Sequence, residues 1–388
     1  SDIYRRYLEA GADIITANTF SCQRISQADY HLENCAREMA FEGARLARIE
    51  CDKFSTPDKP RFVAGDVGPT NKTCSMSPDV SNPAAREITY DELFTDVCEQ
   101  VDGLIEGGAD VILIETIFDT LNCKAMIDAA LTMMKKHGVE LPVMISLTVS
   151  DLAGRTLSGQ TVDAFLASLS PYPIFSVGMN CAFGAPQMKP FIEHMAQVAP
   201  YYISAHPNAG LPNEMGEYDE TAESMAPQIA EFIDEGIVNI IGGCCGTTPE
   251  FIKKTVEKTA DIPLNITEKN YTLVSSYTHA HEVGDKKPTL IGERINPTGK
   301  PKFKEALRRN DIPYIVNEGL SQAEKGLLTD VEEVLLFLNK FLSNRTQSIE
   351  HIRAVLNEDT GLIDASGKEL FYQDFVTLGG EEFMNTEI

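Results

Sequence analysis

The stretch Gly107-Gly-Ala-Asp-Val-Ile-Leu-Ile-Glu-Thr116 predicts the fold of this chain. Its glycine pair ends a helix-like segment, an apolar run rich in β-branched residues follows at once, and a carboxylate stands at the carboxyl end of that run. The same Gly-Ala-Asp turn introduces another run at Gly11–Asp13. A strand that is apolar on both faces and alternates with helices is typical of a parallel sheet covered by helices.

Seven such runs occupy the first two thirds of the chain. They are Ala12–Asn18, Arg61–Gly68, Ala109–Thr116, Val143–Thr148, Phe175–Cys181, Tyr201–Ala209 and Ile237–Cys245. We interpret them as an α/β fold, a (β/α)₈ TIM barrel without its first strand, because the chain opens inside a helix-like pattern at Ile3–Ala10. A doubly wound open sheet is the alternative.

Composition limits the classes of partner. The chain has 388 residues, enough for one barrel-sized domain and a smaller one, and its net charge of -25 repels nucleic acid and anionic lipid. No apolar stretch approaches the ~20 residues of a membrane helix. The nine scattered cysteines suit free thiols in a reducing compartment. We therefore predict a cytoplasmic protein with neither nucleic acid nor membrane as a partner.

Three of the cysteines are organised. Cys244 and Cys245 lie in Ile241-Gly-Gly-Cys-Cys-Gly-Thr-Thr-Pro249, at the end of a predicted strand. Adjacent cysteines do not easily form a disulfide with each other. Thiolates favour Zn²⁺, and a catalytic zinc site has three protein ligands and one open position, so we predict Cys181 as the third ligand. The alternative is that these are small core residues, since free cysteine packs like a hydrophobe.

Polar residues cluster where the predicted strands end, which is the catalytic face of a barrel. They are Asn18-Thr19, Asp66-Val-Gly-Pro-Thr-Asn71, Glu115-Thr116, Asn180-Cys181, His206-Pro-Asn208 and Cys244-Cys245. The sequence therefore predicts one active site at this end of the barrel.

The pair Asn180-Cys181, followed by Gly242-Gly-Cys-Cys-Gly-Thr-Thr-Pro249, resembles the zinc-binding signature of the homocysteine S-methyltransferase family. Further motifs are similar to the homocysteine module of the cobalamin-dependent methionine synthases: Gly11–Phe20, Leu113–Thr116, Gly154–Gly159 and Ser204–Asn213. The resemblance covers about residues 1–265. The family's first strand carries an Asp-Gly pair that helps to hold the amino acid end of homocysteine. Residues 1–388 contain no counterpart of this strand, so we expect them to hold only part of the substrate site.

A second resemblance begins after a predicted linker at 266–289. The stretch Leu290–Gly299 is similar to the opening strand of a pterin-binding barrel, and the likeness continues over 290–326, with a helix-like stretch near Lys302–Leu307. Residues 327–388 are unassigned, with helical spacing in part. They are too few for the rest of a barrel of typically ~250 residues. Asn296 would therefore contact a pterin, and 5-methyltetrahydrofolate would bind, only if other sequence completed this second barrel.

The first resemblance implies a methyltransferase of the 5-methyltetrahydrofolate-homocysteine type. Zinc held by Cys181, Cys244 and Cys245 would activate L-homocysteine as a thiolate for conversion to methionine. Methylcobalamin would be the donor, supplied by another module or chain, because this chain has no Asp-x-His-x-x-Gly motif. Asn208 is the candidate oxygen at the open zinc position and Glu115 the candidate acceptor for the substrate ammonium, and Asn18 and Thr19 complete the predicted substrate site.

Two other functions stay open at this point. One is methyl transfer from a sulfonium or betaine donor, which the pterin-like segment disfavours. The other is a truncated barrel with a structural zinc and no activity. Among single residues, Glu115 could instead pair with a cation and Asn208 could cap a turn, while Asp66 and His206 are predicted to be structural.

Overall fold

The computed structural model describes residues 1–259 except 80, 83, 84 and 214, residues 272–283 except 277, and residues 301–309, 311, 313–315, 317, 318 and 321. The chain divides into two compact units, Ser1–Glu282 and Val283–Ile388, which we treat separately. Asn296 with its pterin-like motif and the tail 327–388 lie outside the described residues.

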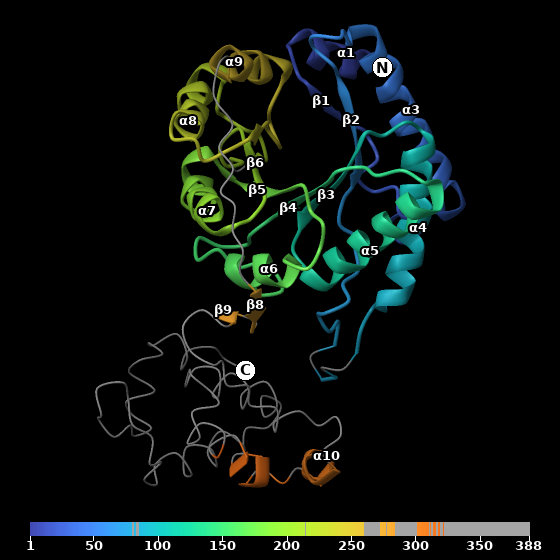
Figure 1. The fold of residues 1–388 in the computed structure, drawn as a ribbon, viewed down its shortest axis with the longest axis vertical. Coiled ribbons are helices and arrows are strands. Elements are labelled where there is room, and N and C mark those ends of the chain that lie inside the picture. Colours follow the sequence, from blue (N-terminus) through green and yellow to red (C-terminus); the bar gives the residue numbers. More distant parts are fainter. Residues whose placement is uncertain are drawn as a thin grey trace. The chain divides into compact units, whose positions relative to one another are not determined.

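The described part of the first unit contains one curled parallel sheet of seven strands (Figure 1). The strands are β1 (Ile14–Thr16), β2 (Phe62–Val67), β3 (Val111–Ile117), β4 (Val143–Leu147), β5 (Ser176–Gly184), β6 (Tyr202–Asn208) and β7 (Ile240–Ile241). Each strand pairs with the next one in sequence, from β1 to β7. A doubly wound sheet would reverse its strand order at a switch point, so this order confirms the barrel-like prediction.

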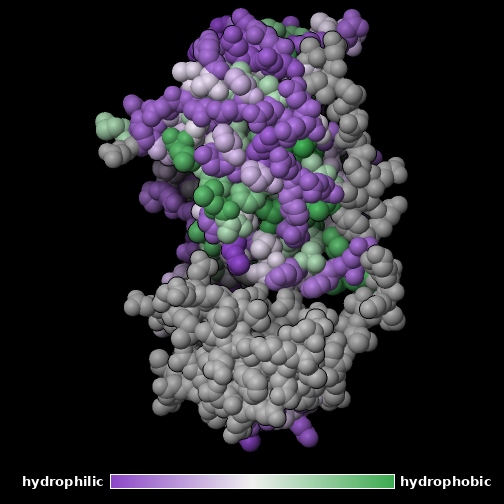
Figure 2. Space-filling view, turned by 90° about the vertical axis from the view of Figure 1, so that its left-hand side faces the viewer, coloured by the Kyte–Doolittle hydropathy of each residue, from purple (hydrophilic) through white to green (hydrophobic). Residues whose placement is uncertain are grey.

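Helices follow the strands and surround the outside of the sheet (Figure 1). They are α1 (Asp2–Glu9), α2 (Arg24–Gln27), α3 (Ala36–Phe54), α4 (Tyr90–Glu106), α5 (Thr120–His137), α6 (Val162–Leu169), α7 (Ala185–Val198), α8 (Ala222–Asp234) and α9 (Pro249–Thr259), with 3₁₀ turns at Ala28–Tyr30 and Glu33–Cys35. Figure 2 looks onto the side of the molecule that carries α7 and α8, where hydrophilic side chains cover most of the surface and hydrophobic ones form small groups. No described helix combines the length and apolar character that crossing a membrane requires.

Local sequence signals set the helix boundaries. Thr89 and Glu92 form a reciprocal capping box at the start of α4, and the Asp119 carboxylate accepts two backbone N–H groups at the start of α5. Gly11 and Gly108, in the repeated Gly-Ala-Asp turns, have φ values of 105° and 92°. Only glycine adopts this conformation without strain, which explains why the same turn precedes two strands.

The sheet separates two apolar layers. Its outer face packs on the helices through fully buried side chains such as Ile112, Ile114 and Ile145. Its inner face forms a smaller cluster, in which Ala64, Leu113 and Met144 are buried and Ile14 and Ile240 pack against them. Because side chains alternate along a strand, every second residue of each strand faces the barrel interior.

The barrel is curled but not closed. Among the described residues β1 and β7 are the edge strands and do not pair with each other. A cavity of about 520 Å³ lies at this opening, lined by Ile14 of β1, Ile240 of β7 and Leu113 of the inner layer, and it reaches Cys244.

A short hairpin lies within the predicted linker 266–289. Its strands are β8 (Thr272–Ser275) and β9 (Ala280–Val283), and the Thr161 hydroxyl before α6 donates to the Thr278 carbonyl at 2.9 Å. Strands of four residues without alternating apolar side chains carry no periodic signal. In the second unit, α10 (Pro301–Arg309) agrees with the helix-like stretch predicted near Lys302–Leu307.

Candidate metal site and its surroundings

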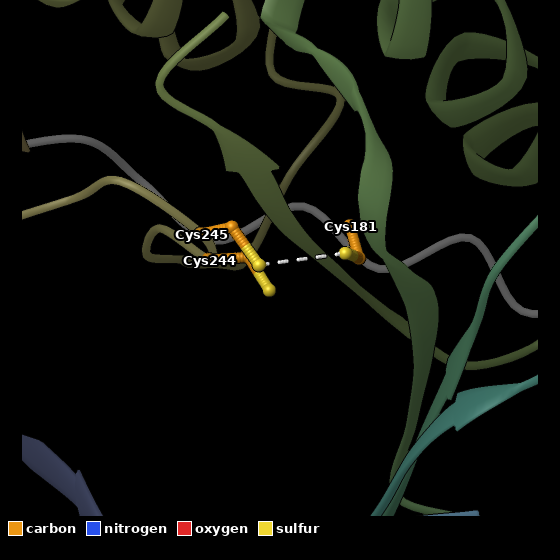
Figure 3. A group of neighbouring side chains, drawn as sticks. All are labelled: Cys181, Cys244 and Cys245. Carbon is orange, nitrogen blue, oxygen red and sulfur yellow. Dashed lines mark hydrogen bonds between the residues drawn. The ribbon is translucent and has the colours of Figure 1, made fainter. Parts of the chain in front are cut away.

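Three cysteines meet at the carboxyl ends of two strands. Cys181 lies near the end of β5, and Cys244 and Cys245 lie in the loop that follows β7 (Figure 3). The Sγ atoms of Cys181 and Cys245 are 3.7 Å apart, and all three sulfurs lie within 4.8 Å of one another. All three thiols are free. The structure thus brings together the three predicted ligands from segments that are distant in sequence.

The spacing of the sulfurs fits a metal. Two thiolates bound to one tetrahedral zinc at ~2.3 Å stand ~3.8 Å apart, close to the 3.7 Å separation of Cys181 and Cys245. Cys181 and Cys244 are half-buried and Cys245 is exposed, so one side of the group faces solvent. Three soft ligands with an accessible side suit zinc with an open position.

The backbone of β5 turns the Cys181 thiol toward this group. Cys181 and Ala182 both have a φ of 60°, a left-handed conformation that is unfavourable for residues other than glycine. The pairing of β5 with β6 shifts register between Asn180 and Gly184. This bulge interrupts the alternation of side chains, as bulges beside active sites commonly do.

The loop after β7 is held by hydrogen bonds to the end of β6 and to the residue that follows it. The Cys244 N–H donates to the Pro207 carbonyl at 2.9 Å, the Cys245 N–H donates to Asn208 Oδ1 at 3.1 Å, and the Ala209 N–H donates to the Cys245 carbonyl at 2.9 Å. The two adjacent thiols are therefore positioned before any ligand binds.

Hydrogen bonds among the three thiols shift their pKa values in opposite directions. Hydrogen bonding from Cys244, supported by the Ala182 N–H, lowers the pKa of the Cys181 thiol to about 5 although burial opposes this. The same hydrogen bond raises the pKa of Cys244, and burial together with the Cys181 charge raises that of Cys245. One thiolate is thus stabilised by two thiols, and full ionisation of all three requires a cation.

Asn180 joins the metal site to the neighbouring strands. Its side chain is 1% exposed, and its Oδ1 accepts from the Thr116 N–H at 3.0 Å and the Ser146 hydroxyl at 2.7 Å. Its Nδ2 donates to Thr116 Oγ1 at 2.8 Å and lies 3.8 Å from Cys244 Sγ. Such outer partners orient metal ligands. The sequence placed Asn180 in the polar cluster beside Cys181 but assigned it no role of its own.

The other predicted site residues take different positions. Asn208 is buried, and besides accepting the Cys245 N–H it hydrogen-bonds the Cys181 thiolate. Thr19 is also buried and its hydroxyl donates to the Asp66 carbonyl at 2.8 Å, so it supports β2. Asn18 is exposed. Their roles toward a substrate remain predictions.

Glu115 lies beside a second carboxyl group. Its side chain hydrogen-bonds that of Asp66, and its charge acts on Cys244. Glu115 belongs to no ion pair of the described residues, so the structure provides no support for pairing with a cation. The sequence could not show that Asp66 and Glu115 meet.

Tyr218 is a further neighbour that the sequence did not indicate. It lies in the loop after β6 and hydrogen-bonds Cys245, and partial burial together with this bond raises the pKa of Tyr218 to about 12. A Cβ at position 246 would collide with its side chain, so Gly246 is what lets Tyr218 approach the cysteine loop.

A second group of potential metal ligands, Asp102, Glu106 and His137, is an ion-pair network. Lys136 and Arg37 lie 2.6 Å and 2.7 Å from the Asp102 carboxylate. Burial opposes ionisation of Asp102, but hydrogen bonds from Lys136, His137 and Arg37 outweigh it and hold the pKa of Asp102 well below its ordinary value. Two cations already neutralise the group, so it stabilises the packing of α3, α4 and α5.

Comparison with known proteins identifies the family of this chain. The family model described as homocysteine S-methyltransferase matches residues 1–259. The chain belongs to the homocysteine S-methyltransferase family. This membership makes it a methyltransferase-family protein with homocysteine as the expected substrate class, and the three cysteines are its possible metal ligands.

Solved structures of the family share the fold. The chain is similar to the homocysteine methyltransferase MmuM from Escherichia coli in its oxidized form, with 19% identity, a TM-score of 0.53, and coverage of 66% of this chain and 82% of that one. The metallated form of MmuM matches with 18% identity, a TM-score of 0.52 and the same coverage, 66% and 82%. At this identity the likeness concerns the barrel fold alone.

Proposed function

We propose that this homocysteine S-methyltransferase family member binds zinc through Cys181, Cys244 and Cys245 and methylates the sulfur of L-homocysteine, giving methionine. The observation that carries the proposal is the meeting of three free thiols within 4.8 Å at the carboxyl ends of barrel strands. A structural zinc would need a fourth protein ligand, and no fourth cysteine, histidine or carboxylate joins this group among the described residues.

Zinc bound here would lower the pKa of the substrate thiol and keep its sulfur reactive as a thiolate. The protein's own part is to hold the three cysteines in place, through the Asn180 network and the bonds between β6 and the cysteine loop. The thiolate sulfur would form a bond to the methyl carbon, and the donor would leave with the electron pair of the bond that breaks. Before substrate binds, the Asn208 oxygen is our candidate for the open position.

The amino acid end of the substrate needs charged partners. Glu115 is our candidate for binding the ammonium group, because its carboxyl group faces the barrel interior near Cys181 and Cys244. Burial is the main cause that raises the pKa of Glu115, and no cation of the described residues neutralises its charge. Asn18 is exposed at the end of β1 and could contact the substrate from that side. Thr19 could do so only through a local rearrangement, since its hydroxyl is already bound.

For the methyl donor we propose methylcobalamin carried by another module or chain. Its sequence support is the set of motifs similar to cobalamin-dependent methionine synthases. Its structural support is a set of exposed apolar side chains in the loops after β4 and β6, on the same end of the barrel as the cysteines: Leu152, Leu157, Leu211 and Met215, which are 72%, 59%, 52% and 83% exposed. These side chains, exposed at the end of the barrel that carries the cysteines, are our reason to favour a large partner over a small polar donor.

Donor assays on the zinc-loaded full chain test this function. We expect methionine to form from homocysteine with methylcobalamin, and not with 5-methyltetrahydrofolate alone. Methionine formation with S-methylmethionine or betaine, and none with methylcobalamin, would show that the proposed donor is wrong. Removal of zinc by a chelator should abolish methionine formation and added zinc should restore it, whereas full activity of the metal-free chain would contradict the proposal.

We also expect Asn180→Leu to weaken zinc binding by about 10- to 100-fold, the usual effect of losing an outer partner of a metal ligand. Leucine has a similar volume but cannot donate to Cys244 or accept from Thr116. Competition with a chromophoric chelator measures the affinity. Ser146→Ala, which removes one bond to Asn180 and none to the cysteines, is the matched control and should have a smaller effect; equal affinities of both variants and the wild type would show that Asn180 is not needed.

A further inference from the structure

The register of β2 and β3 places the carboxyl groups of Asp66 and Glu115 on the inner face of the sheet. Asp66 of β2 pairs with Leu113 of β3, an inner-layer residue. Because every second residue of a strand faces the same side, Asp66 and Glu115, two residues beyond Leu113, both face inward. Both stand near the carboxyl ends of their strands, on the level of the cysteine group.

In the part of the chain that the structure describes, these carboxyl groups contact each other and form no ion pair. Asp66 is 3% exposed, and its Oδ1 meets no hydrogen-bond donor in the described part of the chain. No ion pair of the described residues includes either group, although Asp66 and Glu115 hydrogen-bond each other. Two ionised carboxylates only accept hydrogen bonds, so this contact requires a proton between them.

The proton belongs on Asp66. Burial, reinforced by the Glu115 charge, raises the pKa of Asp66 well above its ordinary value of 3.8. Burial also raises the pKa of Glu115, but the hydrogen bond from Asp66 opposes that rise. Asp66 is thus the donor and Glu115 the ionised acceptor.

The other titratable groups near the pair supply no positive charge. Tyr4 of α1 and Cys22 after β1 lie on the Asp66 side, and burial raises the pKa of both. Cys181 and Cys244 lie on the Glu115 side. Among the described residues, the pair therefore carries negative charge without a cation beside it, and its shared proton stands between the two carboxyl groups.

We propose that Asp66 is the second carboxylate of the homocysteine ammonium site, and that binding of the ammonium group expels the Asp66 proton to solvent. This inference rests on the proposed function, since it needs homocysteine to bind beside the cysteines. Free Asp66 and Glu115 share one proton and one negative charge. With the ammonium bound, both are ionised, one proton has left, and three charges form one hydrogen-bonded group.

Calorimetric titrations in buffers of different ionisation enthalpy test the proposal by counting protons on the zinc-loaded full chain at pH 6.5. Homocysteine should release about two protons, one from its thiol and one from Asp66, because ligand thiols must be deprotonated. 4-Sulfanylbutanoate, which has the thiol and the carboxylate but no ammonium, should release about one. Equal release by the two ligands would overturn the role of Asp66, whereas no release by either would instead contradict zinc activation of the thiol.

The variant Asp66→Asn keeps the shape of the pair but removes the proton that can be released. The amide can donate to Glu115 as protonated Asp66 does, but it has no proton to lose, so homocysteine should release only the thiol proton. Asp96→Asn is the matched control, because Asp96 is a buried carboxyl group that caps α2 away from the site, and its release should equal that of the wild type. Unchanged release in Asp66→Asn would overturn the proposal.

Stability without substrate gives an independent readout. A carboxyl group with a raised folded pKa destabilises the fold as pH rises above its unfolded value, here 3.8, until the folded pKa is reached. Asp66→Asn removes this cost. The melting temperature of the variant should therefore exceed that of the wild type by a margin that grows as pH rises above 3.8 and levels off at the folded pKa of Asp66, while its affinity for homocysteine falls. A variant that loses stability and affinity together at every pH would indicate a structural role only.

Discussion

Cys244→Ser is expected to abolish zinc binding and to lower methionine formation by more than ~100-fold, because losing a direct ligand should exceed the ~10- to 100-fold effect of losing an outer one. Cys244 contacts several parts of the site. Its thiol hydrogen-bonds Cys181, lies beside Asn180, and lines the interior cavity. Serine keeps the size and the backbone bonds of the loop, but a hydroxyl is a poor ligand for zinc compared with a thiolate. Elemental analysis of the purified chain measures zinc, and methionine formation measures activity.

Cys35→Ser is the matched control for this substitution. Cys35 is also a half-buried free thiol, but it lies in a 3₁₀ turn before α3 and outside the cysteine group. The control should retain one zinc per chain and full activity. If Cys244→Ser kept its zinc with wild-type affinity, the three-cysteine site would be wrong whatever the activity.

Gly178→Ala is expected to destabilise the first unit by about 3 kcal/mol or more, at the upper end of overpacking effects. A Cβ at this position would overlap the backbone oxygen and hydroxyl of Ser204 on the paired strand β6. The overlap is with backbone, so no side-chain rotation relieves it, and β5 must move away from β6. That movement would also displace Cys181, three residues further along β5. Urea unfolding followed by circular dichroism measures the loss.

Gly138→Ala is the control that measures the cost of replacing a glycine where the new Cβ meets no other atom. Gly138 ends α5 with a φ of 67°, and an added Cβ there meets nothing within 4 Å. Its substitution should cost only about 1 kcal/mol, from backbone strain alone. Equal losses in the two variants would show that the close approach of β5 and β6 does not limit stability.

The repeated strand pattern could be predicted because it is local. Each of the seven predicted runs contains one of the strands β1 to β7 or overlaps it by most of its length. A buried strand needs a continuous apolar run, and the glycine turn before it needs a positive φ, so both features are visible in a few consecutive residues. The hairpin of β8 and β9 was not predicted, because its short strands lack this signal.

The candidate site could be predicted only in part. The adjacent cysteines in a glycine-rich loop indicated a metal, and their placement after a strand indicated the catalytic end of the barrel. Thr19 shows the limit of this reasoning: it follows a strand like the other polar residues, yet its side chain is buried against β2. A position at a strand end does not determine whether a side chain faces the cavity or the neighbouring strand.

By itself, the sequence determined the parallel barrel, the family resemblance and the three cysteines as candidate ligands, since each depends on residue types within short motifs. Only the tertiary structure decided which groups meet across strands. The register of β2 against β3 places Asp66 beside Glu115, and the bulge in β5 turns Cys181 toward Cys245 while Asn180 bonds to β3 and β4. These contacts depend on the pairing of distant segments, and a shift of one residue in that pairing would turn each side chain to the opposite face.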